Sequence, residues 1–309
     1  MDKQLTVFAP AKLNLHLVVG EKRSDGFHNL ESIFLKADFG DTLSFLPVDD
    51  QNSIKIVMEF GEDACITGNS SLTDIPQEEN IIYKAVSLFR SKTGFCQGLI
   101  IKAEKRIPAG GGLGGGSSDA ACALLALNQI AGSPLNFDRL LELAAALGSD
   151  VPFFIHETNA ALVTGRGECI KPLKTPRMFL TLVNPGFPSD TASAFRLLDN
   201  YRLQASGGNK TSIPESPPFT RQRSASLRLR KKDFTNMYND FLPVFPEREK
   251  SVYNGIIAQL MELGACFASL SGSGSTCFGV FNGKDSAENA ALVLGKKWKF
   301  VRVCKTLLK

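Results

Sequence analysis

The segment Pro108–Ala120 has the residue types needed to hold a phosphate group. It reads PAGGGLGGGSSDA, with six glycines among thirteen residues, and a predicted helix follows it directly. A glycine-rich turn lets several backbone N–H groups converge with no side chains in the way, and the start of a helix adds unpaired amides and the positive end of its dipole. The segment is therefore predicted to bind an anion. The alternative is a structural glycine turn packed closely on a sheet.

The common nucleotide-binding loops do not describe this segment. The Walker A pattern GxxxxGK[ST] needs a lysine after its last glycine, and no lysine occurs between Lys105 and Gln129. The pattern GxGxxG matches, but the acidic residue that should end a second strand, Asp138, opens a predicted helix instead. A protein-kinase glycine loop lies in a β-hairpin, whereas here a helix follows. A more general anion-binding turn is the remaining interpretation.

Two further positions could carry chemistry. Lys12 begins an alternating strand pattern, KLNLHL, that places Lys12, Asn14 and His16 on one face. Asp150 lies just past a predicted helix that ends at Gly148. By themselves these residues have ordinary explanations, because a strand lysine is usually solvated and an aspartate before a proline often forms a helix cap or an Asx-turn. No functional role is expected for His16.

The composition excludes several classes of protein. The 309 residues suit two domains, and a content of 43% hydrophobic and 21% charged residues is that of an ordinary globular protein. Three histidines, and seven cysteines without metal-ligand spacing, leave little material for a histidine-based metal site or a Ser-His-Asp triad. The cysteines are expected to be reduced and mostly buried. No signal peptide or membrane span is predicted, so a cytoplasmic protein is expected.

The formal net charge of +4 depends on one segment. Residues 204–233 are rich in Ser, Pro and Gly, and contain six basic residues between Arg221 and Lys232. This stretch is predicted to be a mobile surface insertion, and a basic docking site for a partner is the alternative.

Alternating β and α segments must position these residues. Strands are predicted at 5–20, 32–37, 42–46, 53–60, 99–104, 160–165, 178–186, 276–281 and 299–307, and helices at 80–93, from about 117 to 132, and at 136–148, 252–263 and 286–294. The glycine-rich segment thus connects a strand to a buried helix.

Three stretches, in this order, resemble the small-molecule kinases related to galactokinase, homoserine kinase and mevalonate kinase (GHMP kinases). They are APAKLNLHL at 9–17, PAGGGLGGGSSDAA at 108–121 and SLSGSGSTCF at 269–278, of which the last alone could be a flexible hairpin. Within that group the sequence is most similar to the kinases of 4-diphosphocytidyl-2-C-methyl-D-erythritol, because of SDGFHNLESIF at 24–34 and GSDVPFF at 148–154. The resemblance covers nearly the whole chain apart from the insertion.

The resemblance implies a two-domain α+β fold. Residues 1–164 would form an ATP-binding domain like the second domain of ribosomal protein S5, and residues 165–309 a ferredoxin-like domain. The implied reaction transfers the γ-phosphate of ATP, which travels with Mg²⁺, to the 2-hydroxyl of the cytidylated methylerythritol in the non-mevalonate isoprenoid pathway. No carboxylate cluster for Mg²⁺ is evident, and Asp119 is only a candidate contributor.

The resemblance also assigns roles to individual residues. Asp150 would accept the proton of the hydroxyl, and Lys12 would keep it ionised. His28 would hydrogen-bond the cytosine, with aromatic rings stacked on the base, although tyrosine is common where this chain has Phe27. ATP-binding positions are Asn80, Lys105, Pro108, Ala109, Gly110, Gly111, Gly112, Leu113, Gly114, Gly115, Gly116, Ser117 and Ser118. Substrate-binding positions are Asn14, Phe27, His28, Phe34, Thr191, Phe195, Gly272, Ser273 and Gly274. Alternatively, His28 is a surface histidine and Phe34 a core residue.

The expected partners are the small-molecule substrate and ATP, with no nucleic acid and no membrane, and the chain is expected to be a monomer or weak homodimer. A sister kinase acting on homoserine, mevalonate or a sugar is the nearest rival. A basic nucleic-acid-binding protein on a related fold and a Rossmann dehydrogenase are the rivals from other classes.

Overall fold

The computed structural model describes residues 4–61, 64, 76–205 and 229–308, which form two compact units. The first unit comprises Met1–Ala11, Phe39–Ala109 and Gly114–Glu157, and the second comprises Lys12–Asp38, Gly110–Leu113 and Thr158–Lys309. Two long strands, β1 (Leu5–Lys22) and β2 (His28–Val48), contribute residues to both units. The single domain boundary after Thr164 remains a prediction. Most of the predicted insertion, residues 206–228, lies outside the described residues.

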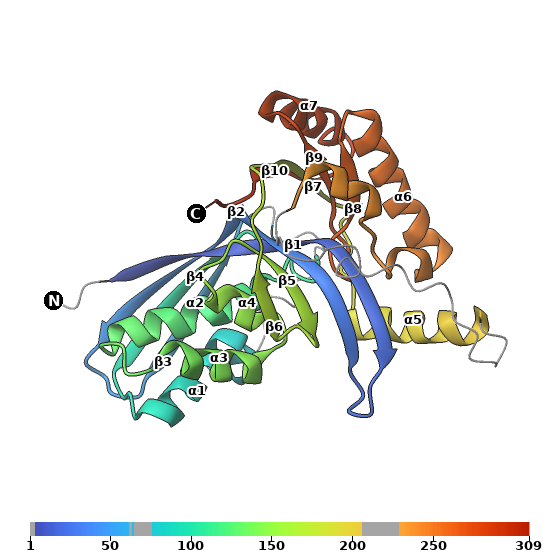
Figure 1. Ribbon diagram of the computed structural model, residues 1–309. Coiled ribbons are helices and arrows are strands. Elements are labelled where there is room, and N and C mark those ends of the chain that lie inside the picture. Colours follow the sequence, from blue (N-terminus) through green and yellow to red (C-terminus); the bar gives the residue numbers. More distant parts are fainter. Residues whose placement is uncertain (1–3, 62–63, 65–75, 206–228, 309) are drawn as a thin grey trace. The chain divides into compact units, whose positions relative to one another are not determined.

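The first unit combines a sheet with helices. Strand β3 (Ile54–Phe60) runs parallel to β4 (Gly98–Lys105), and β4 pairs antiparallel with the second half of β2. The helices are α1 (Ile81–Thr93), α2 (Gly115–Ile130), α3 (Phe137–Leu147) and the short α4 (Val151–Ile155), with the turn η2 (Gln77–Glu79) before α1. Figure 1 shows these helices gathered beside β3 and β4. They pack on one another, and α2 begins inside the glycine-rich segment, at Gly115.

The second unit contains the predicted ferredoxin-like domain. Its antiparallel sheet has the order β10-β7-β9-β8, formed by β7 (Phe179–Asn184), β8 (Phe267–Leu270), β9 (Cys277–Phe281) and β10 (Phe300–Lys305). Helices α6 (Glu247–Glu262) and α7 (Lys284–Leu294) pack on this sheet (Figure 1). This β-α-β-β-α-β arrangement confirms the prediction for the domain and, with the first unit, the α+β class.

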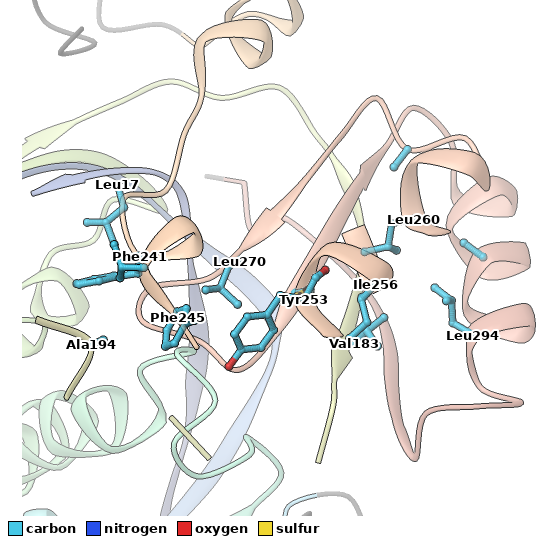
Figure 2. Close-up of a cluster of buried hydrophobic side chains, with 14 of the residues drawn as sticks. Leu17, Val183, Ala194, Phe241, Phe245, Tyr253, Ile256, Leu260, Leu270 and Leu294 are labelled. Atoms are coloured by element: carbon cyan, nitrogen blue, oxygen red, sulfur yellow. Dashed lines mark hydrogen bonds between the residues drawn. The ribbon is translucent and has the colours of Figure 1, made fainter. Parts of the chain in front are cut away.

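Further elements complete the second unit. Strands β5 (Ala160–Gly165) and β6 (Cys169–Pro172) extend from the first half of β2. Two short 3₁₀ helices, η4 (Lys231–Asn236) and η5 (Leu242–Val244), lead into α6. Figure 2 shows the hydrophobic core of this unit, in which side chains of α6 meet those of the sheet and of β1.

Helix α5 (Thr191–Ala205) was not among the predicted elements. The carboxylate of Asp190 caps it by accepting hydrogen bonds from the N–H groups of Ala192 and Ser193, at 3.3 and 3.0 Å. Hydrogen bonds from the side chain of Ser193 and from these N–H groups lower the pKa of Asp190, because they favour its charged form. An aspartate directly before a threonine is a common start of a helix, and that signal was overlooked.

Helix α2 begins at Gly115, two residues earlier than predicted. Gly114 has a left-handed backbone conformation, with φ of 69°, and turns the chain into the helix. Residues on nearly every side of α2 are buried, which explains why its sequence is apolar all round.

The expectation that most cysteines are buried is wrong for half of those described. Cys122, Cys277 and Cys304 are buried free thiols, whereas Cys96, Cys169 and Cys266 are exposed ones. None of the helices in the described ranges is long and apolar enough to span a bilayer.

An ion cluster in the first unit ties together the two ends of the glycine-rich segment. Lys105, at the end of β4, bonds to the carboxylates of both Asp41 in β2 and Asp119 in α2. The second oxygen of Asp41 accepts hydrogen bonds from the N–H groups of Arg106 and Ile107, at 2.5 and 2.8 Å. The cluster therefore fixes the strand end that precedes the segment against the helix that follows it.

Asp119 is almost completely buried in this cluster. Its Oδ1 atom has no hydrogen-bond partner among the described residues. Burial, with a smaller effect from the charge of Asp41, raises the pKa of Asp119 to about 7, although Lys105 acts in the opposite direction.

This raised pKa predicts a pH-dependent stability. The folded chain keeps a proton on Asp119 that the unfolded chain loses near its ordinary value of 3.8, so the contribution of Asp119 to the free energy of unfolding falls as the pH rises from 3.8 to about 7. The Asp119→Asn variant cannot titrate there, so its free energy of unfolding, measured with urea, should fall less across this range than that of the wild type. The exposed Asp138→Asn variant is the control. An Asp119→Asn curve as steep as that of the wild type would contradict the assignment.

Candidate active site

Three segments far apart in the sequence meet within the second unit. They are β1, the apex of the glycine-rich segment and the loop between β8 and β9. The N–H of Lys12 donates a hydrogen bond to the carbonyl oxygen of Leu113 at 2.8 Å. The hydroxyl of Ser271 donates to the carbonyl oxygen of Gly112 at 3.0 Å and accepts from the N–H of Asn14 at 3.3 Å. The three stretches that carried the family resemblance are thus in direct contact.

This contact requires glycine at position 112. The backbone of Gly112 has φ of 74°, and a Cβ atom there would lie against the carbonyl oxygens of Ser271 and Gly274. Gly272 lies opposite, also left-handed, with φ of 58°. The two loops consequently pack backbone against backbone, which no residue with a side chain would allow at position 112.

A fourth segment, at the start of α5, joins these loops. The N–H of Ser189 donates a hydrogen bond to the carbonyl oxygen of Gly110 at 2.9 Å. The hydroxyl of Ser189 donates to the carbonyl oxygen of Ser273 at 2.6 Å. The hydroxyls of Thr191 and Ser273 lie 2.9 Å apart. The structure therefore brings together two predicted substrate-binding residues, Thr191 and Ser273.

Lys12 is a buried cation and not a solvated lysine at a strand edge. Its side chain is 5% exposed, and its Nζ donates to Oδ1 of Asn14 at 2.7 Å. The same Nζ lies 4.6 Å from the centre of the Phe34 ring. Asn14 is held in turn by a 2.9 Å hydrogen bond from its Nδ2 to the hydroxyl of Ser32. Three predicted residues, Lys12, Asn14 and Phe34, therefore form one group.

His28 is buried, which rules out a plain surface histidine. Its Nε2 lies 2.8 Å from Oδ1 of Asp199, and its ring stacks on that of Phe195 at 5.0 Å with an angle of 22° between the planes. Phe27 stands apart from this stack, since it is 51% exposed and lies under the guanidinium of Arg166. The sequence reasoning missed Asp199, which shares a face of α5 with Phe195 four residues earlier.

His16 is enclosed in the second unit. It is 1% exposed, and its Nδ1 accepts a hydrogen bond from the N–H of Tyr238 at 3.1 Å. Burial lowers the pKa of His16, so the ring is neutral near pH 7. These contacts give His16 a structural place in the second unit.

Three further predicted residues, Asn80, Lys105 and Asp150, lie in the first unit. Asn80 caps α1 by accepting the N–H of Ile82 at 2.9 Å, and the Nζ of Lys105 is held in the ion cluster. Asp150 lies at the start of α4, but its side chain makes no capping hydrogen bond there. The explanation of Asp150 as a helix cap is therefore not supported, and its catalytic role stays a prediction.

The start of α2 suits an anion. Its N-cap residue is Gly114, which has no side chain to cap the first amides of the helix, and amides at a helix start can bind an anion. Gly116 is exposed and Ser117 half-buried, whereas Ser118 is fully buried. In the described ranges no group of three His, Cys, Asp or Glu residues could hold a metal ion, and the carboxylate of Asp119 is engaged with Lys105.

Comparison with known proteins is consistent with this arrangement. The model of the GHMP kinases N terminal domain matches residues 80–158, and that of the GHMP kinases C terminal matches residues 227–299. A 4-diphosphocytidyl-2-C-methyl-D-erythritol kinase of Thermodesulfovibrio yellowstonii is 36% identical over 315 residues, with 98% of each chain covered. One of Treponema pallidum is 34% identical over 309 residues, covering 98% of this chain and 99% of that protein.

Solved structures agree. The crystal structure of a 4-(cytidine 5'-diphospho)-2C-methyl-D-erythritol kinase matches with a TM-score of 0.74 and 30% identity, covering 99% of this chain and 100% of that one. The mevalonate kinase of L. major in complex with R-mevalonate matches with a TM-score of 0.69 but 16% identity, which shows a shared fold alone, over 99% of this chain and 98% of the other. The chain therefore belongs to the GHMP kinases, in the family of 4-diphosphocytidyl-2-C-methyl-D-erythritol kinases.

Proposed function

We propose that this chain transfers the γ-phosphoryl group of ATP to the 2-hydroxyl of 4-diphosphocytidyl-2-C-methyl-D-erythritol. The observation that supports this most is the contact of β1, the glycine-rich apex and the loop before β9 inside one unit, which joins the strand of the buried Lys12 to the glycine-rich turn. The names of the curated relatives supply the substrate.

In this proposal the glycine-rich segment binds the triphosphate. Backbone amides of its turn and of the first turn of α2 would donate to phosphate oxygens, with little interference from side chains. Mg²⁺ enters with ATP as part of the substrate, and it neutralises charge on the phosphate oxygens when bound. The residues described here fit the phosphates better than the metal, because Asp119 is engaged with Lys105.

Transfer itself needs a base and a fixed positive charge. The oxygen of the 2-hydroxyl attacks the γ-phosphorus, the bond to the bridging oxygen of ADP breaks, and the hydroxyl proton passes to the carboxylate of Asp150. The ammonium of Lys12 would stabilise the charge that develops on the reacting oxygens. Asn14 and Phe34 hold that ammonium in place at 2.7 and 4.6 Å.

His28 would recognise the cytosine through its Nδ1 atom. The carboxylate of Asp199 accepts a hydrogen bond from Nε2, so a neutral imidazole keeps Nδ1 as an acceptor. The exocyclic amine of cytosine is a matching donor. Phe195, stacked on the imidazole, fixes its plane. We assign Asp199 as a positioning residue, since it acts on the base only through His28.

A panel of alcohols tests the proposed substrate. ADP release should occur with 4-diphosphocytidyl-2-C-methyl-D-erythritol and not with homoserine, mevalonate or galactose, because only the first carries the cytosine that His28 would bind. Turnover of homoserine without turnover of the cytidylated alcohol would overturn the proposal in favour of a sister kinase.

The same assay run on Asp199→Ala tests the cytosine contact. The KM for the cytidylated alcohol should rise about tenfold, the effect of one polar contact, with a much smaller change in kcat. Asp285→Ala, at an exposed position in α7, is the matched control. A fall in kcat together with an equal rise in the KM for ATP would instead indicate a general structural role for Asp199.

Asp150→Asn tests the base. Removing a general base should lower kcat about 100-fold or more. The affinity for ATP, measured by equilibrium binding, should stay close to that of the wild type, because the amide keeps the shape of the carboxylate. Asp138→Asn is the control. A comparable loss of ATP affinity would mean that Asp150 is structural.

A further inference from the structure

Ser32, a fully buried serine on β2, both donates and accepts a hydrogen bond next to the group around Lys12. Its hydroxyl donates to the carbonyl oxygen of His16 at 2.5 Å and accepts from Nδ2 of Asn14 at 2.9 Å. The Oδ1 atom of Asn14 accepts in turn from Nζ of Lys12 at 2.7 Å. A chain of hydrogen bonds therefore runs from the backbone of β1 to the ammonium group.

The number of protons available fixes the direction of each bond in this chain. A carbonyl oxygen only accepts hydrogen bonds, so the single hydroxyl proton of Ser32 is committed to His16. The hydroxyl of Ser32 can then meet Asn14 only as an acceptor, and the donor in that side chain is its NH₂ group. The other end of the amide, its oxygen, consequently faces Lys12.

A reversed Asn14 amide would create two mismatched contacts. Its oxygen would face Ser32, whose proton is already used, and its NH₂ group would face the ammonium of Lys12, so that donor would meet donor. Asn14 is 3% exposed, which leaves little room for water to compensate. Because buried polar groups without partners cost free energy, the reversed orientation is unfavourable.

The chain of hydrogen bonds begins at a well-anchored part of β1. The N–H of Leu17 donates to the carbonyl oxygen of Tyr238 at 2.8 Å, and the N–H of Asp240 donates to the carbonyl oxygen of Leu17 at 3.0 Å. The imidazole of His16 accepts the N–H of Tyr238 at 3.1 Å. The carbonyl group that receives the proton of Ser32 thus belongs to a strand section tied to the chain before η5.

A second serine holds the backbone of the same asparagine. The hydroxyl of Ser271 donates to the carbonyl oxygen of Gly112, so it accepts from the N–H of Asn14. The main chain of Asn14 is therefore held by Ser271 and its side chain by Ser32. Removing the hydroxyl of Ser32 should free the amide without breaking the loop contact at Gly112.

We propose that Ser32 is a positioning residue for Lys12, because it holds the amide of Asn14 with its oxygen toward the ammonium. This inference rests on the function proposed above, in which that ammonium stabilises the reacting oxygens. An ammonium has three N–H donors, and with one committed to Asn14 the directions of the other two are set. Small displacements of such a group are costly for group transfer. Ser32 therefore affects turnover rather than the binding of ATP.

Nuclear magnetic resonance of the wild type tests the amide orientation without any kinase activity. The side-chain amide protons of Asn14, assigned by their loss in Asn14→Ala, should show strong nuclear Overhauser contacts to the Hβ protons of Ser32. Their contacts to the Hε protons of Lys12 should be weaker or absent. Contacts mainly to Lys12 would reveal a reversed amide and overturn the proposal, whichever alcohol the enzyme phosphorylates.

The kinetics of Ser32→Ala test the consequence for turnover. The kcat with the cytidylated alcohol should fall about tenfold, the effect of one lost hydrogen bond, while the KM for ATP should stay within about twofold of the wild type. Ser44→Ala, the same change at a half-buried position further along β2, is the matched control and should match the wild type.

A double variant separates positioning from packing. If Ser32 acts only through Asn14, adding Ser32→Ala to Asn14→Ala should cause no further fall in kcat. Additive losses, an unchanged kcat in Ser32→Ala, or a rise in the KM for ATP equal to the fall in kcat would each overturn the proposal. The resonance measurement on the wild type can still refute it if Ser32→Ala does not fold. Failure of the proposed function would appear instead as a wild type that does not phosphorylate the cytidylated alcohol.

Discussion

The candidate site within the second unit depends on the close approach of two backbones at Gly112. Because position 112 has no side chain, its carbonyl reaches the hydroxyl of Ser271, and that hydroxyl also accepts the N–H of Asn14. One serine therefore links the glycine-rich apex to the strand that carries Lys12. A side chain at position 112 would force these segments apart and move the lysine relative to the glycine-rich turn.

Each unit contains a buried lysine, Lys105 in the first and Lys12 in the second. In the first unit Lys105 is surrounded by two carboxylates, and burial raises the pKa of one of them, Asp119, to about 7. That cluster holds the two ends of the glycine-rich segment against each other. In the second unit the ammonium of Lys12 contacts an amide oxygen and an aromatic face.

Long-range contacts explain what the sequence could and could not predict. The α+β class, the strand-to-helix glycine turn and the group around Lys12 followed from alternation and from three stretches with specific residues. The partner of His28 did not, because α5 was missed and Asp199 lies 171 positions further along the chain. The ion cluster was missed for the same reason, since Asp41 and Lys105 are 64 residues apart and neither looks unusual alone.

Replacing Gly112 by alanine, next to the same change at Gly132, tests most directly whether the loop contact builds the phosphate site. Both glycines are left-handed, with φ of 74° and 79°, but only Gly112 has backbone atoms where a Cβ would lie. We expect kcat/KM for ATP to fall about 100-fold in folded Gly112→Ala, the cost of a displacement near 1 Å. Gly132→Ala should stay within about twofold of the wild type, because nothing surrounds it. Equal kinetics in the two variants would contradict the central role of this contact.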